Sequence, residues 1–84
     1  MKEFSYKTKG TCSTRIDLIL DDSNIITGVK FTNGCNGNTQ GVAKLAVGRP
    51  AEEIIGLLKG ISCGGRPTSC PDQLARALEI AIAE

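Results

Sequence analysis

Four cysteines are the residues with the clearest chemical potential in this chain of 84 residues. They are Cys12, Cys35, Cys63 and Cys70, and the sequence contains no histidine. Four thiolates can bind a tetrahedral zinc ion or hold an iron–sulfur cluster. No two of these cysteines are separated by only two residues, which is the spacing common in zinc ribbons and fingers. The residue types therefore favour a thiolate metal site, while the spacing alone does not identify one.

Thiol–disulfide exchange between Cys63 and Cys70, which have six residues between them, is the redox alternative. Exchange requires an accessible thiol of low pKa, and Cys70 is the better candidate because it sits at or next to the N-cap of a predicted helix. Cys35 also precedes a predicted helix. The third interpretation is that each cysteine is a small buried apolar residue.

Composition argues against several classes of protein. The formal net charge is +1 and aromatic residues make up 4% of the chain, so the basic surface and stacking rings of a general nucleic-acid-binding protein are missing. No apolar run approaches the length of a membrane span, and residues 1–4 do not resemble the start of a signal peptide. We therefore expect a cytoplasmic protein whose thiols stay reduced.

Apolar and polar residues alternate along the first part of the chain, which predicts strands over residues 3–9, 12–20 and 25–32. The polar residues 21–24 predict a hairpin turn. Cys12 shares the parity of the apolar residues in the second strand and is expected to point inward. The predicted core face of the third strand consists of Ile25, Val29 and Phe31.

Helical periodicity and capping residues predict helices in the second part of the chain. The first runs over 40–47, with Asn38 or Thr39 as its N-cap and Gly48 at its end. The second begins at Pro50 and is closed by Gly60. The last begins at Pro71, with Asp72 in its first turn and apolar residues at helical spacing thereafter.

Strands followed by helices predict an α+β fold. We expect one domain over residues 1–84, with a three-stranded antiparallel meander followed by two or three helices packed on one face. A chain of this length has marginal stability unless a metal or self-association supplements its core. Apolar residues on several faces of the last helix favour a homodimer; they are Ala75, Ile80 and Ala83.

Residues 68–72 read Thr-Ser-Cys-Pro-Asp, which is the motif that names the TSCPD domain family. Three further stretches, at 10–13, 34–37 and 60–64, also resemble the pattern of that family, and each contains one of the other cysteines. The resemblance covers nearly the whole chain and implies a single copy of this small domain.

The resemblance also implies a link to ribonucleotide reduction, because the domain is found near the C-terminus of adenosylcobalamin-dependent ribonucleotide reductases. A chain of 84 residues is too short for a reductase barrel, its radical-site cysteines or a cobalamin pocket. We therefore expect an accessory module, not a complete oxidoreductase, with a ribonucleotide reductase or a thioredoxin-like protein as its partner.

A second resemblance is to iron–sulfur cluster scaffold proteins, which also combine strands, a Gly-Cys turn and helices. Those proteins use three cysteines, to which Cys35, Cys63 and Cys70 would correspond. Cys12 would then be surplus.

Overall fold

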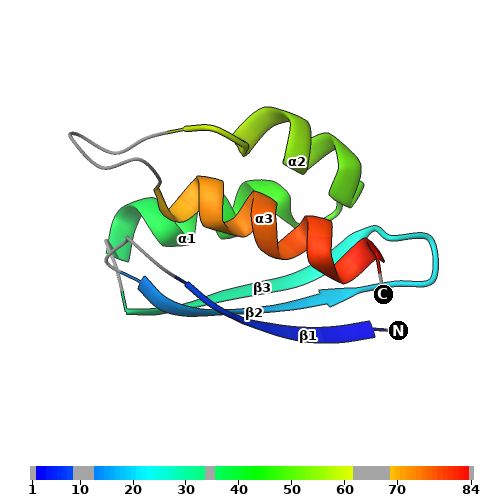
Figure 1. Cartoon of the computed structure of the whole chain (residues 1–84), viewed down its shortest axis with the longest axis horizontal. Coiled ribbons are helices and arrows are strands. Elements are labelled where there is room, and N and C mark those ends of the chain that lie inside the picture. Colours follow the sequence, from blue (N-terminus) through cyan, green and yellow to red (C-terminus); the bar gives the residue numbers. More distant parts are fainter. Residues whose placement is uncertain (1, 9–12, 34–35, 62–68, 84) are drawn as a thin grey trace.

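The computed structural model describes residues 2–8, 13–33, 36–61 and 69–83. Three strands come first and three helices follow (Figure 1). The elements are β1 (Lys2–Lys7), β2 (Ser13–Leu20), β3 (Ile26–Asn33), α1 (Asn36–Ala46), α2 (Ala51–Leu58) and α3 (Cys70–Ala83). The strands form one antiparallel sheet in the order β1-β2-β3, so the α+β prediction and the meander are confirmed.

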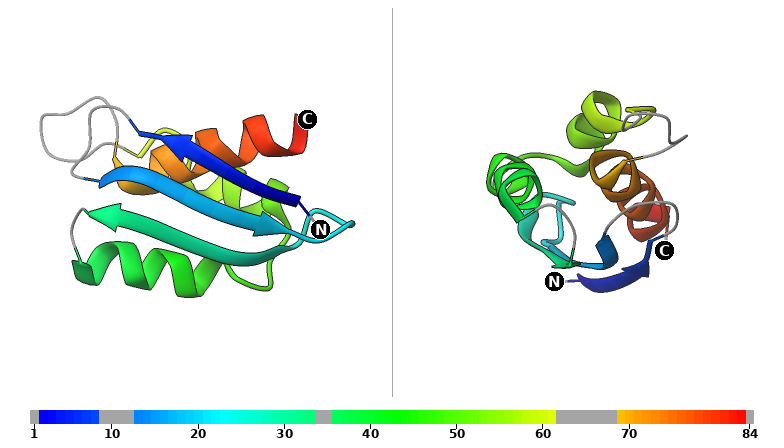
Figure 2. Two further views of the ribbon diagram at one scale, coloured as in Figure 1. Left: turned by 90° about the horizontal axis from the view of Figure 1, so that it is seen from below. Right: turned by 90° about the vertical axis from the view of Figure 1, so that its left-hand side faces the viewer.

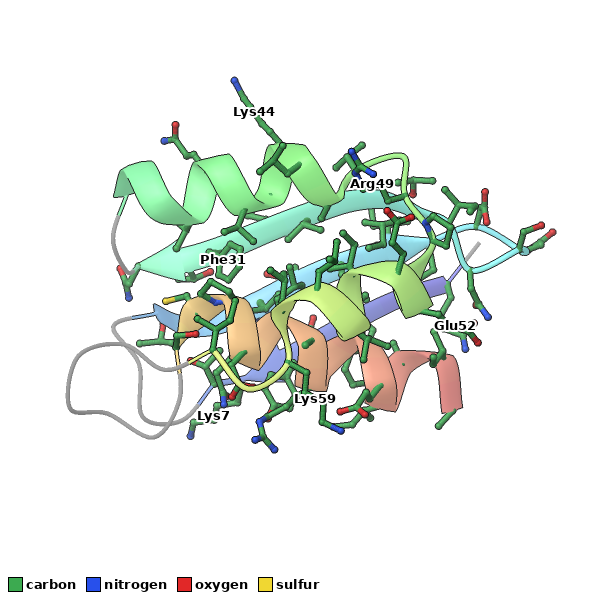
Figure 3. All side chains as sticks on the ribbon, turned by 90° about the horizontal axis from the view of Figure 1, so that it is seen from above. Lys7, Phe31, Lys44, Arg49, Glu52 and Lys59 are labelled. Carbon is green, nitrogen blue, oxygen red and sulfur yellow. The ribbon has the colours of Figure 1, made fainter. Side chains whose placement is uncertain are left out.

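All three helices lie on the same side of the sheet (Figure 2). α1 packs beside β3, and α3 packs against β1 and β2. α2 packs mainly on α3, and it lies between α1 and α3 when the molecule is viewed from the helix side (Figure 3). The largest fully buried apolar side chains come from the sheet and from α3; they are Ile16, Leu18, Leu20, Ile26, Leu74 and Leu78.

The hairpin between β2 and β3 is held in part by one side chain. Asp21 Oδ1 accepts hydrogen bonds from the backbone N–H groups of Ser23 and Ile25, both at 2.9 Å. Asn24 adopts a φ of 61°, a left-handed conformation that asparagine tolerates better than most residues. The polar turn predicted at residues 21–24 is therefore confirmed. Its aspartate side chain accepts two hydrogen bonds, and two backbone bonds at 3.0 Å, from Asp21 N–H to Ile25 and from Asn24 N–H to Asp21, also close the turn.

The predicted core face of the third strand is wrong at one position. Ile26, not Ile25, is fully buried. Ile19 pairs with Gly28 whereas Leu20 pairs with Ile26, so one extra residue of β3 lies opposite this step in β2. Such a bulge interrupts the period-two alternation. Val29 and Phe31 keep their inward parity and pack against the core, as predicted.

The first helix begins four residues earlier than predicted. α1 starts at Asn36, so neither Asn38 nor Thr39 is its N-cap, and Thr39 is buried instead. Asparagine and glycine are poor helix formers, and packing on β3 outweighs that propensity. Gly48 follows the helix with a φ of 89° and donates its N–H to the carbonyl of Ile26, at 2.7 Å. Its role as a terminating glycine is confirmed.

The second helix and the last helix differ from prediction by one residue each. Pro50 is the N-cap of α2, and the helix begins at Ala51. Gly60, with a φ of 91°, follows its C-cap. α3 begins at Cys70, one residue before Pro71. No described helix has the length and apolar composition that a membrane span requires.

The face of the sheet away from the helices carries a small polar network. Ser5 donates its hydroxyl hydrogen bond to Asp17 Oδ1 at 2.6 Å, and the Arg15 guanidinium contacts the same oxygen at 2.9 Å. The hydrogen bond from the Ser5 hydroxyl, and to a smaller extent the hydrogen bond and charge of Arg15, hold the pKa of Asp17 below its ordinary value of 3.8. All three side chains are partly or largely exposed, so the network contributes little to stability.

We expect Ser5→Ala to raise the pKa of Asp17, because its strongest hydrogen bond is lost. The depressed pKa contributes stability that is present above the unfolded-state pKa of about 3.9 and is lost as pH falls through the folded-state pKa. An NMR titration of the Asp17 carboxyl carbon in both proteins measures the effect, with Ser23→Ala as the control. Identical titration midpoints for Asp17 in wild type and Ser5→Ala would contradict this assignment.

Candidate functional site

The start of α3 contains Cys70, the one cysteine among the described residues. Its side chain is 6% exposed and lies in the first turn of the helix. The prediction that Cys70 lies next to an N-cap is confirmed. Its burial does not fit the redox interpretation, which required an accessible thiol at this position. Cys12, Cys35 and Cys63, together with the inward orientation expected of Cys12, lie outside the described residues.

Ser69 is the N-cap of α3. Its hydroxyl accepts a hydrogen bond from the backbone N–H of Asp72 at 3.1 Å, and its carbonyl accepts the N–H of Gln73 at 2.8 Å. The same hydroxyl donates to the carbonyl of Ile61 at 2.6 Å. Ser69 therefore caps α3 and also ties it to the chain that leaves α2.

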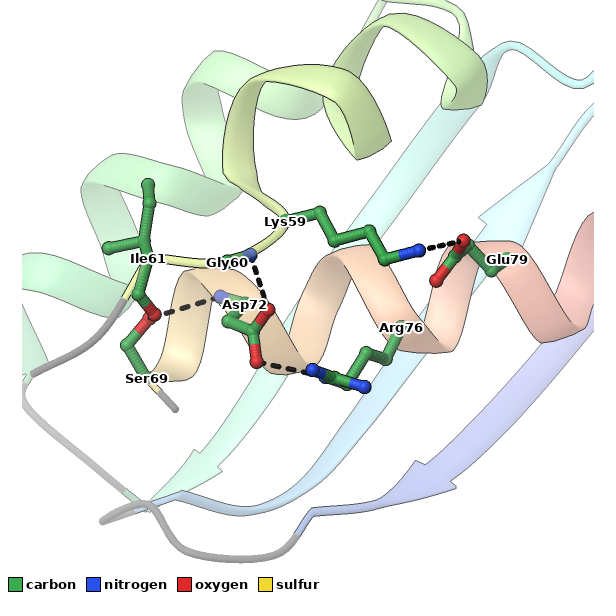
Figure 4. A network of polar contacts seen from close by, with 7 residues as sticks. All are labelled: Lys59, Gly60, Ile61, Ser69, Asp72, Arg76 and Glu79. Carbon is green, nitrogen blue, oxygen red and sulfur yellow. Dashed lines mark hydrogen bonds and ion pairs between the residues drawn. The ribbon is translucent and has the colours of Figure 1, made fainter. Parts of the chain in front are cut away.

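Asp72 connects the same two segments through its side chain (Figure 4). One carboxylate oxygen, Oδ1, accepts the backbone N–H of Gly60 at 2.7 Å, and the other, Oδ2, accepts Arg76 Nε at 2.9 Å. The carboxylate is fully buried, whereas the guanidinium is half exposed. This hydrogen bond from Nε, together with the negative charge of Asp72, raises the pKa of Arg76 above its ordinary value.

A carboxylate in the first turn of a helix is also stabilised by the helix dipole. Pro71 fits the same turn, where a backbone N–H has no intrahelical acceptor. Three residues of the Thr-Ser-Cys-Pro-Asp motif thus have structural roles: Ser69 caps the helix, Pro71 lies in its first turn and Asp72 joins it to Gly60. Cys70 is the described motif residue whose side chain offers metal or redox chemistry.

Sequence reasoning assigned Asp72 only to a favourable position in the first helical turn. Its principal partner is a backbone N–H twelve residues earlier in the chain, which no local pattern indicates. In the sequence, Ser69 is followed three residues later by an acidic residue, as in a capping box, and this pattern is the one sequence feature that points to a bonding role for Asp72. The aspartate here bonds to Gly60 and not back to the N-cap residue.

The described ends of five elements and the described chain after α2 meet at one end of the molecule (Figure 1). These are the last residues of β1 and β3, the first residues of β2, α1 and α3, and residues 59–61, which leave α2. Pairing of Lys7 with Arg15 and of Ser13 with Asn33 brings the strand ends together, and the bond from Ser69 to Ile61 adds the helix ends. Among the described residues, no three Cys, Asp or Glu side chains are close enough to hold a metal ion.

These features define a small α+β domain whose strand and helix ends converge beside the start of its last helix. The chain belongs to the TSCPD domain family, whose model matches residues 2–82. Comparisons with curated proteins and with solved structures yield no match.

Proposed function

We propose that this chain is a thiolate metal-binding module, with zinc as its simplest metal, that acts as an accessory part of a ribonucleotide reductase. The observation that carries the proposal is the convergence of described chain ends on the side of the molecule where Cys70 begins α3. Each of the other cysteines is close in sequence to one of those ends.

The sequence neighbours of the cysteines make this argument specific. Cys12 directly precedes Ser13, the first residue of β2, and Cys35 directly precedes Asn36, the first residue of α1. Cys63 follows Ile61 by two residues, and the Ile61 carbonyl accepts the Ser69 hydroxyl beside Cys70. A site at this end would therefore draw on four segments that are distant in sequence.

The available donors favour thiolate ligands. Asp72 is the nearest carboxylate in sequence to Cys70, and its two oxygens already bond to Gly60 and Arg76. The chain has no histidine. Four thiolates match the tetrahedral preference of zinc. A bound zinc ion would supply folding energy to a domain with a small core.

Membership of the TSCPD domain family supports the link to ribonucleotide reductase, in whose adenosylcobalamin-dependent members this domain is found near the C-terminus. The proposal assigns an accessory role because the matched residues, 2–82, correspond to this small domain and not to the reductase barrel. A direct contact with the reductase, or with a thioredoxin-like protein that serves it, is the expected partnership.

Replacing single cysteines tests the metal site. We expect wild-type protein to retain about one zinc per chain, and Cys35→Ser, Cys63→Ser and Cys70→Ser each to retain less than about a tenth of that amount. Cys12→Ser is measured in the same series, because Cys12 is the fourth proposed ligand. Ser23→Ala, in the hairpin at the other end of the sheet, is the matched control and should retain all of it.

The outcome distinguishes the competing functions. Iron and sulfide in place of zinc would move the assignment to an iron–sulfur scaffold, for which cluster transfer is the next assay. Full metal retention in all the cysteine variants would refute the thiolate site.

A further inference from the structure

An apolar groove lies between α1 and α2, on the side of the molecule away from the sheet. It has a volume of about 230 Å³ and is lined mainly by Val42, Leu45, Ala46, Ile54, Leu57 and Leu58. Leu45 is 70% exposed and Leu57 is 63% exposed, so two large apolar side chains stand at the groove in contact with solvent. They are the two most exposed of the large apolar side chains in the described residues.

Two helical glycines flank these leucines. Gly41 lies one turn before Leu45 on α1 and shares its face, whereas Gly56 directly precedes Leu57 on α2 and points about 200° away from Ile54, on the side of α2 opposite the groove. A Cβ built at either glycine would meet nothing within 4 Å, and both residues are exposed. A larger residue would therefore fit at either position in the monomer. Glycine is also a poor helix former, so neither helix packing nor helix propensity in the monomer explains its presence. Small residues on exposed helices allow another backbone to approach closely.

We propose that this face, formed by Gly41, Leu45, Leu57 and the groove between α1 and α2, is the contact between two copies of the chain. The face presents protruding leucines and an apolar groove side by side. A two-fold axis would therefore let each copy insert a leucine into the groove of the other, as an isologous interface requires.

Charge and size also fit a second copy. Arg49 and Glu53, which pair with each other at 2.9 Å, place one charge of each sign at this face, so two copies would not repel each other. A standard interface takes about 800 Å² from each partner, roughly a sixth of the 4807 Å² surface. One long side of a molecule measuring 37 × 20 × 20 Å supplies such an area.

The position differs from the dimer face expected from sequence. That expectation used Ala75, Ile80 and Ala83 of the last helix. Ala75 is fully buried within the monomer and cannot contact a partner, and Ile80 is 42% exposed, less than either leucine. α1 and α2, rather than α3, therefore provide the apolar surface.

Sedimentation equilibrium of the full chain tests the proposal, with the Ile80→Glu variant as the matched control on α3. We expect wild-type protein to sediment as a dimer of 8.8 kDa chains at micromolar concentration. Leu45→Glu should raise the dissociation constant at least about 100-fold while leaving the circular dichroism spectrum unchanged, whereas Ile80→Glu should leave the dissociation constant within about threefold.

A second variant separates association from folding. Gly41→Gln should keep or raise the melting temperature of dilute monomer, because glutamine is the better helix former, and yet weaken association at least about tenfold. A chain that remains monomeric up to about 1 mM would overturn the proposal. So would a dimer that Ile80→Glu dissociates and Leu45→Glu does not.

Discussion

Asp72→Ala is expected to lower the free energy of unfolding by about 2–4 kcal/mol. The substitution leaves the N–H of Gly60 without its charged acceptor and removes the carboxylate from the first turn of α3. It also removes one hydrogen bond that joins the chain leaving α2 to the start of α3, while the bond from Ser69 to Ile61 remains. For a domain of this size the loss corresponds to a fall in melting temperature of roughly 10–20 °C.

Two comparisons isolate the cause of that loss. Asp72→Asn keeps an oxygen that can accept the Gly60 N–H and should cost less than Asp72→Ala. Glu52→Ala removes an exposed first-turn carboxylate from α2 and should cost less than about 0.5 kcal/mol. Urea unfolding of the four proteins measures the series. A cost for Asp72→Ala no larger than that of Glu52→Ala would show that the buried carboxylate does not join α2 to α3.

Removal of metal is expected to have the larger effect on stability. If zinc binds the folded chain and not the unfolded chain, its binding free energy adds to the free energy of unfolding. Excess chelator should therefore lower the melting temperature by roughly 15 °C or more.

The control for this experiment is the same chelator preloaded with zinc, which should leave the melting temperature unchanged. Restoring zinc after chelation should restore the original transition. A melting temperature that is the same with free and with zinc-loaded chelator would contradict a structural metal.

The elements of the fold were predictable because their sequence patterns are local. Strands over 3–9, 12–20 and 25–32 became β1, β2 and β3 with shifts of one or two residues at most ends. Ile26 replaced Ile25 on the core face because a bulge depends on pairing with β2, which the alternation of a single strand does not contain. The early start of α1 has a similar origin, since packing on β3 outweighed weak helix formers.

The candidate site was predictable only in part. Cys70 at the start of the last helix followed from Pro71 and the apolar periodicity after it. The burial of Cys70 and the bonds of Asp72 to Gly60 and Arg76 depend on the packing of α2 against α3. That packing joins segments twelve residues apart, and no spacing rule describes it.

The motif that names the family therefore combines residues that hold the structure together with one residue, Cys70, that is proposed to bind metal. Ser69 and Asp72 hold the chain that leaves α2 against the first turn of α3. This arrangement positions Cys70 at the end of the molecule where the other chain ends converge. The central claim is that the cysteines reached from these ends form one metal site.

Elemental analysis of protein purified without oxygen or chelator, with thiols counted on the same sample, tests this claim most directly. The account predicts about one zinc per chain and four thiols that react only after the metal is removed. Protein that contains no metal and whose four thiols all react in the native state would contradict it.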